Sequence, residues 1–136
     1  PEVDDGVGTL FYIKGRVEYK MGEFRQAAFS LRQSLSLNPV HIHSKFYLAV
    51  SLDELKEYNE EVGLYTQLIK QDPLSMHIYS FNRGIVLHDL ERYEEAVESF
   101  DDVITLDPND ACAFNGKGLA FELMSQFNDA IECYDQ

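Results

Sequence analysis

Residues 83–110 read RGIVLHDLERYEEAVESFDDVITLDPND, and this stretch decides the fold. Its apolar residues recur at helical spacing on both sides of Tyr93. Gly84 lacks a side chain and would let a second helix approach closely. Proline disfavours helix at the residue before it and cannot continue a helical hydrogen-bond ladder, so the pair Asp107–Pro108 ends the pattern. The stretch therefore predicts two helices joined by a short turn.

The same features recur along the chain at intervals of 34 or 35 residues. The rows are Gly15, Ala49, Gly84 and Gly118; Phe24, Tyr58, Tyr93 and Phe127; Leu31, Tyr65, Phe100 and Tyr134; and Pro39, Pro73 and Pro108. A fixed period of this length is typical of stacked helical repeats. We expect the small row to sit at the helix crossing, the aromatic row to begin each second helix, and the prolines to end it.

The rows predict eight helices with short connections and no strands. Their expected ranges are 8–21, 24–37, 42–55, 58–71, 77–90, 93–106, 111–124 and 127–136. The repeats then occupy 8–41, 42–76, 77–110 and 111–136, the last cut short, after a frayed segment at 1–7. The second repeat is irregular, because Glu61 stands where a small residue is expected. We expect this glutamate to splay the helix pair or to turn outward.

The rows resemble the tetratricopeptide repeat over nearly the whole chain. The resemblance is carried by residues 83–110, by KGRVEYKMGEFRQAAFSLRQSLSLNP at 14–39 and by KGLAFELMSQFNDAIECYDQ at 117–136. It implies an all-α fold, a right-handed α-α superhelix of about four helix–turn–helix repeats. It also implies that the first helix of each repeat lines a concave face. Lys45 and Ser80 depart from the family's aromatic pattern, which Phe11 and Phe114 follow.

Composition excludes several classes of function. The formal net charge is −13, from 11 Lys and Arg against 24 Asp and Glu. Nucleic acids and anionic membranes are bound through cations, so both are disfavoured as partners. No apolar run approaches the ~18 residues of a membrane span. The two cysteines, Cys112 and Cys133, suggest free thiols in a reducing compartment, and we expect a cytoplasmic location.

The resemblance places a peptide-binding groove on the first helices. Its expected lining is Tyr12, Arg16, Tyr19, Phe46, Tyr47, Val50, Phe81, Asn82, Ile85, Asn115 and Leu119. Its expected acidic rim is Asp53, Glu54, Asp89 and Glu122. Tyr and Phe are favoured as interface anchors, and Asn82 and Asn115 could bond a peptide backbone. The alternative interpretation is that these aromatic side chains only pack hairpin against hairpin.

One specialisation of the family, a cationic clamp for the C-terminal carboxylate of heat-shock chaperones, is not expected here. The clamp uses Lys and Asn on the first helix, Asn on the third, and Lys and Arg on the fifth. Those places hold Tyr12 and Arg16, Tyr47, and Ile78 and Asn82. Counting from one repeat later does not supply the cations either.

The sequence predicts a protein that is not an enzyme and has no cofactor or metal. No phosphate-binding loop, dinucleotide fingerprint, nucleophile elbow or zinc-binding helix motif occurs. His41 and His43 are interpreted as surface residues and His88 as groove polarity. The leading hypothesis is an interaction module for a protein or peptide with basic and apolar residues. The alternatives are part of a larger scaffold, self-association through the uncapped C-terminal helix, and the targeting arm of an enzyme.

Overall fold

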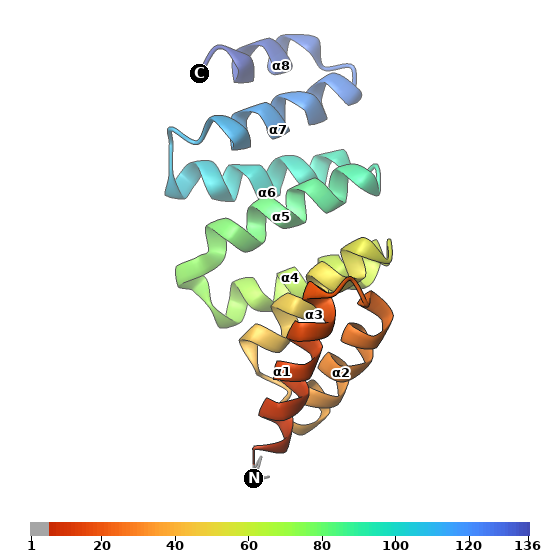
Figure 1. The fold of residues 1–136 in the computed structure, drawn as a ribbon. Helices are drawn as coiled ribbons and strands as arrows, with labels where there is room; N and C mark the ends of the chain where they lie inside the picture. The colour runs from red at the N-terminus through yellow and green to blue at the C-terminus, as the bar shows by residue number, and fades with distance from the viewer. Residues whose placement is uncertain (1–5) are drawn as a thin grey trace. The chain divides into compact units, whose positions relative to one another are not determined.

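The computed structural model describes residues 6–136, which form eight α-helices, one short 3₁₀-helix and no strand (Figure 1). The helices are α1 (Val7–Lys20), α2 (Phe24–Leu37), α3 (Ile42–Glu54), α4 (Tyr58–Gln71), η1 (Pro73–Ser75), α5 (Met76–Asp89), α6 (Tyr93–Leu106), α7 (Ala111–Leu123) and α8 (Phe127–Tyr134). Each predicted helix is present, with ends within two residues of the expected positions. The short helix η1 lies in the connection between the second and third repeats. Of the predicted frayed segment, residues 1–5 lie outside the described residues, and α1 already begins at Val7.

The chain divides into two compact units, Pro1–Gln71 and Asp72–Gln136. In the first unit α1 pairs with α2 and α3 pairs with α4, while α3 also packs on α1 and α2. In the second unit α5 pairs with α6 and α7 pairs with α8, while α7 also packs on α5 and α6. Successive helices run antiparallel in each unit (Figure 1). Each unit is therefore two helical hairpins, with the two first helices in contact.

Each hairpin turn holds one residue in the left-handed region. These residues are Gly22 (φ 82°), Lys56 (φ 62°), Glu91 (φ 58°) and Ser125 (φ 61°). A residue with a Cβ is strained in this conformation, and only the first turn uses glycine. All four turns thus have the same backbone geometry, although three of them lack the glycine that suits it best.

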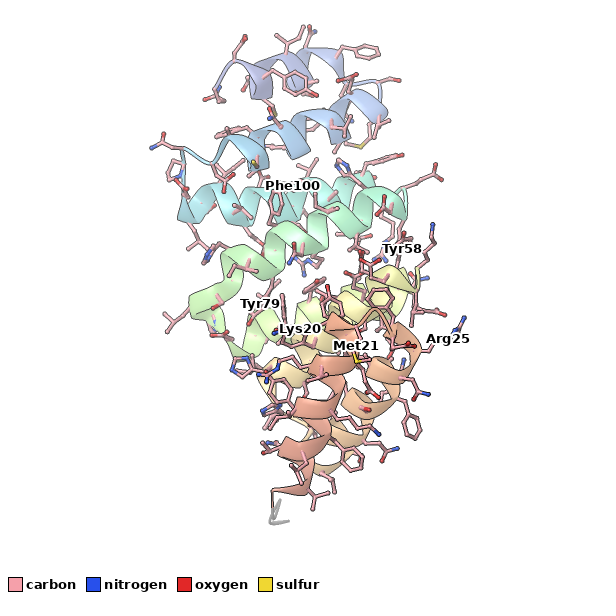
Figure 2. The ribbon with its side chains drawn as sticks, viewed as in Figure 1. Lys20, Met21, Arg25, Tyr58, Tyr79 and Phe100 are labelled. Atoms are coloured by element: carbon pink, nitrogen blue, oxygen red, sulfur yellow. The ribbon has the colours of Figure 1, made fainter. Side chains whose placement is uncertain are left out.

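In the first, third and fourth repeats, the glycine of the row Gly15, Ala49, Gly84 and Gly118 meets the residue of the row Leu31, Tyr65, Phe100 and Tyr134 where the two helices cross. A Cβ added at Gly15 would lie 2.7 Å from Leu31, and one at Gly84 would lie 2.8 Å from the Phe100 ring. The same ring, labelled in Figure 2, would lie 2.5 Å from a Cβ at Gly116 on α7. Leu31 and Phe100 are fully buried. Glycine is therefore required by space at these crossings.

The expectation that Glu61 turns outward is wrong. Its side chain is 1% exposed and hydrogen-bonds Tyr65, which is itself buried. Burial first, and then the nearby Glu61 carboxylate, raise the pKa of the Tyr65 hydroxyl above its ordinary range. A hydroxyl that stays protonated can donate to the carboxylate, which offsets part of the cost of burying it. The glutamate is accommodated because a polar partner lies one helical turn away on α4 (Tyr58–Gln71).

Two glycines give opposite predictions for the substitution by alanine. Gly84→Ala should lower the free energy of unfolding by about 1–3 kcal/mol, because the added methyl overlaps the buried Phe100 ring. Gly63→Ala should raise it by about 1 kcal/mol, because Gly63 is exposed in α4 with no atom within 4 Å of its would-be Cβ. Urea unfolding followed by circular dichroism measures both. A Gly84→Ala protein as stable as the parent would contradict the crossing.

Candidate functional site

The predicted site residues of the first unit lie on α1 and α3. Tyr47 is at the centre of their aromatic rings, with centroid distances of 6.1 Å to Tyr12, 5.7 Å to Tyr19 and 5.9 Å to Phe46. All four rings are half-buried, and Val50 on α3 is half-buried as well. We call Tyr12, Arg16, Tyr19, Phe46, Tyr47 and Val50 the α1–α3 face. Its aromatic side chains pack on one another and also keep part of their surface exposed.

Arg16 brings a cation to the α1–α3 face. Its guanidinium carbon lies 5.5 Å from the centroid of the Tyr12 ring, a cation–π distance. Its Nε is buried and makes no hydrogen bond to any described residue. The side chain forms no ion pair with any residue within 6–136, so its charge is held mainly against the aromatic ring.

His41 and His43 lie closer to this face than their interpretation as surface residues implied. Their rings are 5.0 Å and 6.0 Å from the Tyr12 ring. The Nδ1 of His41 accepts the backbone N–H of Ser44 at 3.2 Å and so caps the N-terminus of α3. This role could have been suspected from the position of His41 just before an apolar helical pattern.

The acidic residues predicted beside the first face lie at the end of α3. Asp53 is half-buried and Glu54 is exposed. Burial raises the pKa of the Tyr19 hydroxyl, and the negative charges of Glu54 and Asp53 add to this rise. The carboxylates are therefore close enough to Tyr19 to act on it electrostatically.

The predicted site residues of the second unit lie on α5 and α7. We call Phe81, Asn82, Ile85, Asn115 and Leu119 the α5–α7 face. Ile85 and Leu119 are 45% and 42% exposed. The Asn82 and Asn115 amides make no hydrogen bond to any residue within 6–136. Phe81 is half-buried and packs edge-to-face on Phe100 of its own hairpin, with ring centroids 5.7 Å apart.

The two acidic residues predicted for the second unit differ in their surroundings. Asp89 is exposed at the end of α5. Glu122 is exposed on α7 but accepts a hydrogen bond from the Tyr134 hydroxyl of α8 at 2.9 Å. Glu122 is thus partly committed to the pairing of α7 with α8.

A pocket at the N-terminal ends of α5 and α7 adds residues that the sequence analysis did not assign to a site. It is lined by His77, Ile78, Phe81, Asn82, Asp110 and Cys112 and has a volume of about 310 Å³. Only Phe81 and Asn82 were predicted. The others belong to the first turn of a helix or the residue before it, and the repeat pattern gives no signal for such positions.

His88 packs against aromatic rings of the second unit, whereas it was expected to be a solvated polar residue of the groove. Its ring lies 5.6 Å from Phe100 and 6.0 Å from Tyr93. It hydrogen-bonds the backbone of Gly116, and its Nε2 is buried without a partner among the described residues. Burial lowers the pKa of His88, although the Gly116 bond and the Asp89 charge act in the opposite direction.

Two further observations limit the chemistry of the described residues. No group of three or more His, Cys, Asp and Glu side chains within 6–136 is placed to hold a metal ion. Over the same range, no helix combines the length and apolar character of a membrane span.

Antiparallel helical hairpins that recur at a fixed interval, each with glycine or alanine in its first helix, define a helical-repeat protein. Models of the family described as tetratricopeptide repeat match residues 12–75 and 78–110. The chain belongs to the tetratricopeptide repeat family. Domains of this family generally serve protein–protein interaction and are typically not enzymes.

One related sequence and two solved structures are similar to this chain. A TPR repeat-containing protein, MJ1428, of Methanocaldococcus jannaschii is 32% identical over 60 residues, which are 44% of this chain and only 11% of that protein. The structure of MamA from residue 41 of Desulfovibrio magneticus RS-1 has a TM-score of 0.84 at 21% identity, over 98% of this chain and 73% of that one. The first TPR of Spaghetti (RPAP3), bound to the HSP90 peptide SRMEEVD, has a TM-score of 0.79 at 19% identity, over 91% and 98%. These likenesses confirm the predicted all-α fold of helical repeats.

The lowered pKa of His88 predicts a loss of stability in acid. Between the folded pKa and the ordinary value of 6.5, the unfolded chain binds a proton that the folded unit does not. The free energy of unfolding should therefore fall as the pH is lowered from 7.5 through this window. His88→Gln should reduce that fall, whereas His77→Gln, at an exposed site on the same helix, should not. Urea unfolding at a series of pH values measures this, and equal pH dependence in the two variants would contradict it.

Proposed function

We propose that this domain captures a segment of a partner protein on the first helices of its hairpins. The observation that carries the proposal is the α5–α7 face, where exposed Ile85 and Leu119 lie on the helices that also carry the unbonded amides of Asn82 and Asn115. Exposed apolar surface beside free polar groups is typical of an interaction site. The α1–α3 face supports the same proposal with half-buried rings and the cation of Arg16.

The partner segment is proposed to carry apolar and basic residues. The acidic residues Asp53, Glu54, Asp89 and Glu122 and the net charge of −13 would attract such a segment. Complementary charge mainly speeds and orients association, while contact at the apolar faces supplies most of the affinity. The role is that of a non-enzymatic module.

A chaperone tail is not the proposed ligand. The Spaghetti domain is bound to SRMEEVD, a peptide that ends in two acidic residues, valine and aspartate. In this chain Tyr12, Tyr47 and Ile78 stand at three places where the carboxylate clamp has polar or cationic side chains. Arg16 alone supplies a cation on the α1–α3 face.

The test selects peptides from a random display library on the immobilised full chain. The double variant Ile85→Ser/Leu119→Ser should raise the Kd of a selected peptide about tenfold or more, because two exposed apolar contacts are lost without disturbing the core. Leu106→Ser is the matched control, since Leu106 is 53% exposed on α6 and lies outside both faces. Fluorescence anisotropy measures the Kd.

Three further results bear on this test. Affinity should fall as salt rises from about 0.05 to about 0.5 M, because screening weakens attraction between exposed charges. Phe46→Ala/Phe81→Ala should weaken binding with helicity kept, and loss of helicity would instead assign these rings to packing. Equal loss of affinity in Leu106→Ser and in the face variant would overturn the proposal.

A second candidate, a structural part of a larger scaffold or a self-associating solenoid, is favoured by α8. Ile131 and Tyr134 are 57% and 46% exposed. At the equivalent places in the first repeat, Ala28 and Leu31 are 6% and 0% exposed, on the helix that packs against α3. The outer side of α8 thus presents a surface that a following helix covers elsewhere in the protein.

Self-association through α8 predicts a mass that rises with concentration. Ile131→Asp should keep the protein monomeric, because a carboxylate in an apolar contact is costly. Light scattering over a wide concentration range measures this. A parent protein that is monomeric throughout would exclude self-association.

A further inference from the structure

The pocket at the N-terminal ends of α5 and α7 has room for an apolar side chain together with part of the adjacent peptide. Its volume of about 310 Å³ lies at the small end of ligand pockets. Ile78 and Phe81 form apolar walls, while Asn82 and Asp110 add polar groups. Such a pocket suits the apolar side chain of a peptide residue, while the peptide backbone and the adjacent residue remain at the polar edge.

The walls of the pocket are held by the fold. Phe81 packs edge-to-face on Phe100, which is fully buried between α5 and α7. Asp110 is fixed because its Oδ1 accepts the backbone N–H of Ala113 at 2.9 Å and caps α7. A pocket that is already ordered loses little entropy when a ligand enters.

The negative charge of the protein is concentrated in the unit that contains this pocket. Residues 72–136 hold fourteen Asp and Glu against three Lys and Arg, a net charge of −11. Residues 1–71 hold ten against eight, a net charge of −2. A potential of this sign favours the approach of cationic segments.

All three cations of the second unit are neutralised within it. Lys117 lies 2.7 Å from Asp101, Arg92 lies 2.7 Å from Glu95, and Arg83 lies 3.7 Å from Asp102. Asp110 has no ion-pair partner among the described residues, and its Oδ2 accepts no hydrogen bond from any of them. No unpaired cation in residues 72–136 therefore competes with a basic group for this carboxylate.

We infer that the pocket holds one leucine-sized apolar side chain of a partner peptide in which the adjacent residue is Lys or Arg. The apolar side chain lies between Ile78 and Phe81, and the cation meets Asp110. The free amide of Asn82 bonds the peptide backbone at the edge. This inference rests on the proposed function and assigns its recognition of apolar and basic residues to one subsite.

Cys112 allows a test that needs no known partner. Its thiol is exposed and lines the pocket, whereas Cys133 is buried. The full chain is treated with four small disulfide reagents, which exchange with the thiol and leave their label attached to it. The reagents share one thioethylamide linker and differ in the dipeptide they carry: Leu-Lys, Leu-Glu, Gly-Lys or Gly-Glu. Intact-mass spectrometry gives the reductant concentration at which half of the label remains. A Cys133→Ala protein confirms that the label is on Cys112.

The Leu reagents should tolerate about tenfold more reductant than the Gly reagents, the gain expected for burying a leucine side chain. The Lys reagents should tolerate about two- to fivefold more reductant than the Glu reagents, because an ion pair near the surface contributes little. Ile78→Ser should reduce only the preference for Leu. Asp110→Asn should reduce only the preference for Lys, because asparagine keeps the helix cap. Leu106→Ser should change neither.

Equal labelling by the four reagents, or a preference for Glu over Lys, would overturn the inference. Protection of Cys112 that appears only at high protein concentration would also overturn it, by showing that a second copy fills the pocket. The selected peptides separate this inference from the proposed function. Peptides that bind Ile78→Ser and Asp110→Asn as tightly as the parent leave the function intact and reject the subsite. If the Leu-Lys reagent is preferred but the library yields no binding peptide, the proposed function is rejected. The pocket then has a preference for Leu-Lys that serves no capture of a partner segment.

Discussion

The second unit depends on the contact between the Phe100 ring and two glycine backbones. The ring is fully buried, and a Cβ at Gly84 or Gly116 would lie 2.8 Å or 2.5 Å from it. One side chain of α6 therefore sets how closely both α5 and α7 approach. Because α5 and α7 then lie in contact, their N-terminal turns meet and form the pocket, whose wall Phe81 rests on the same ring. Packing at the crossing and the shape of the candidate site have one cause.

The helices could be predicted closely because their signals are local and repeated. Glycine or alanine in each first helix, an aromatic residue at the start of each second helix and a proline after the first three second helices recur in step, so each repeat supports the assignment of the others. The outward orientation expected of Glu61 is wrong because the repeat pattern treats each position without its surroundings. Whether a carboxylate can be buried depends on what surrounds it, and here Tyr65 on the next turn provides a hydrogen bond.

The candidate faces could be placed on helices from the sequence, but the surroundings of their side chains could not. Spacing assigns Ile85 and Leu119 to first helices, and both are exposed there. Spacing cannot distinguish a ring that faces solvent from one that packs on a neighbour. The rings of Tyr12, Tyr19 and Tyr47 pack on one another and are also partly exposed. His77, Asp110 and Cys112 join the pocket only because two helix starts meet in space.

The negative charge and the pocket are proposed to contribute to partner recognition in different ways. An exposed carboxylate contributes at most about 1 kcal/mol to an ion pair, so the acidity of residues 72–136 discriminates poorly among basic segments. Burial of one leucine-sized side chain contributes about 1.5–3 kcal/mol and requires a fitting shape. The negative potential therefore selects a class of partner and speeds the encounter, whereas Ile78 and Phe81 select a member of that class. Since Phe81 rests on Phe100, that selectivity depends on the same glycine crossings that hold the unit together.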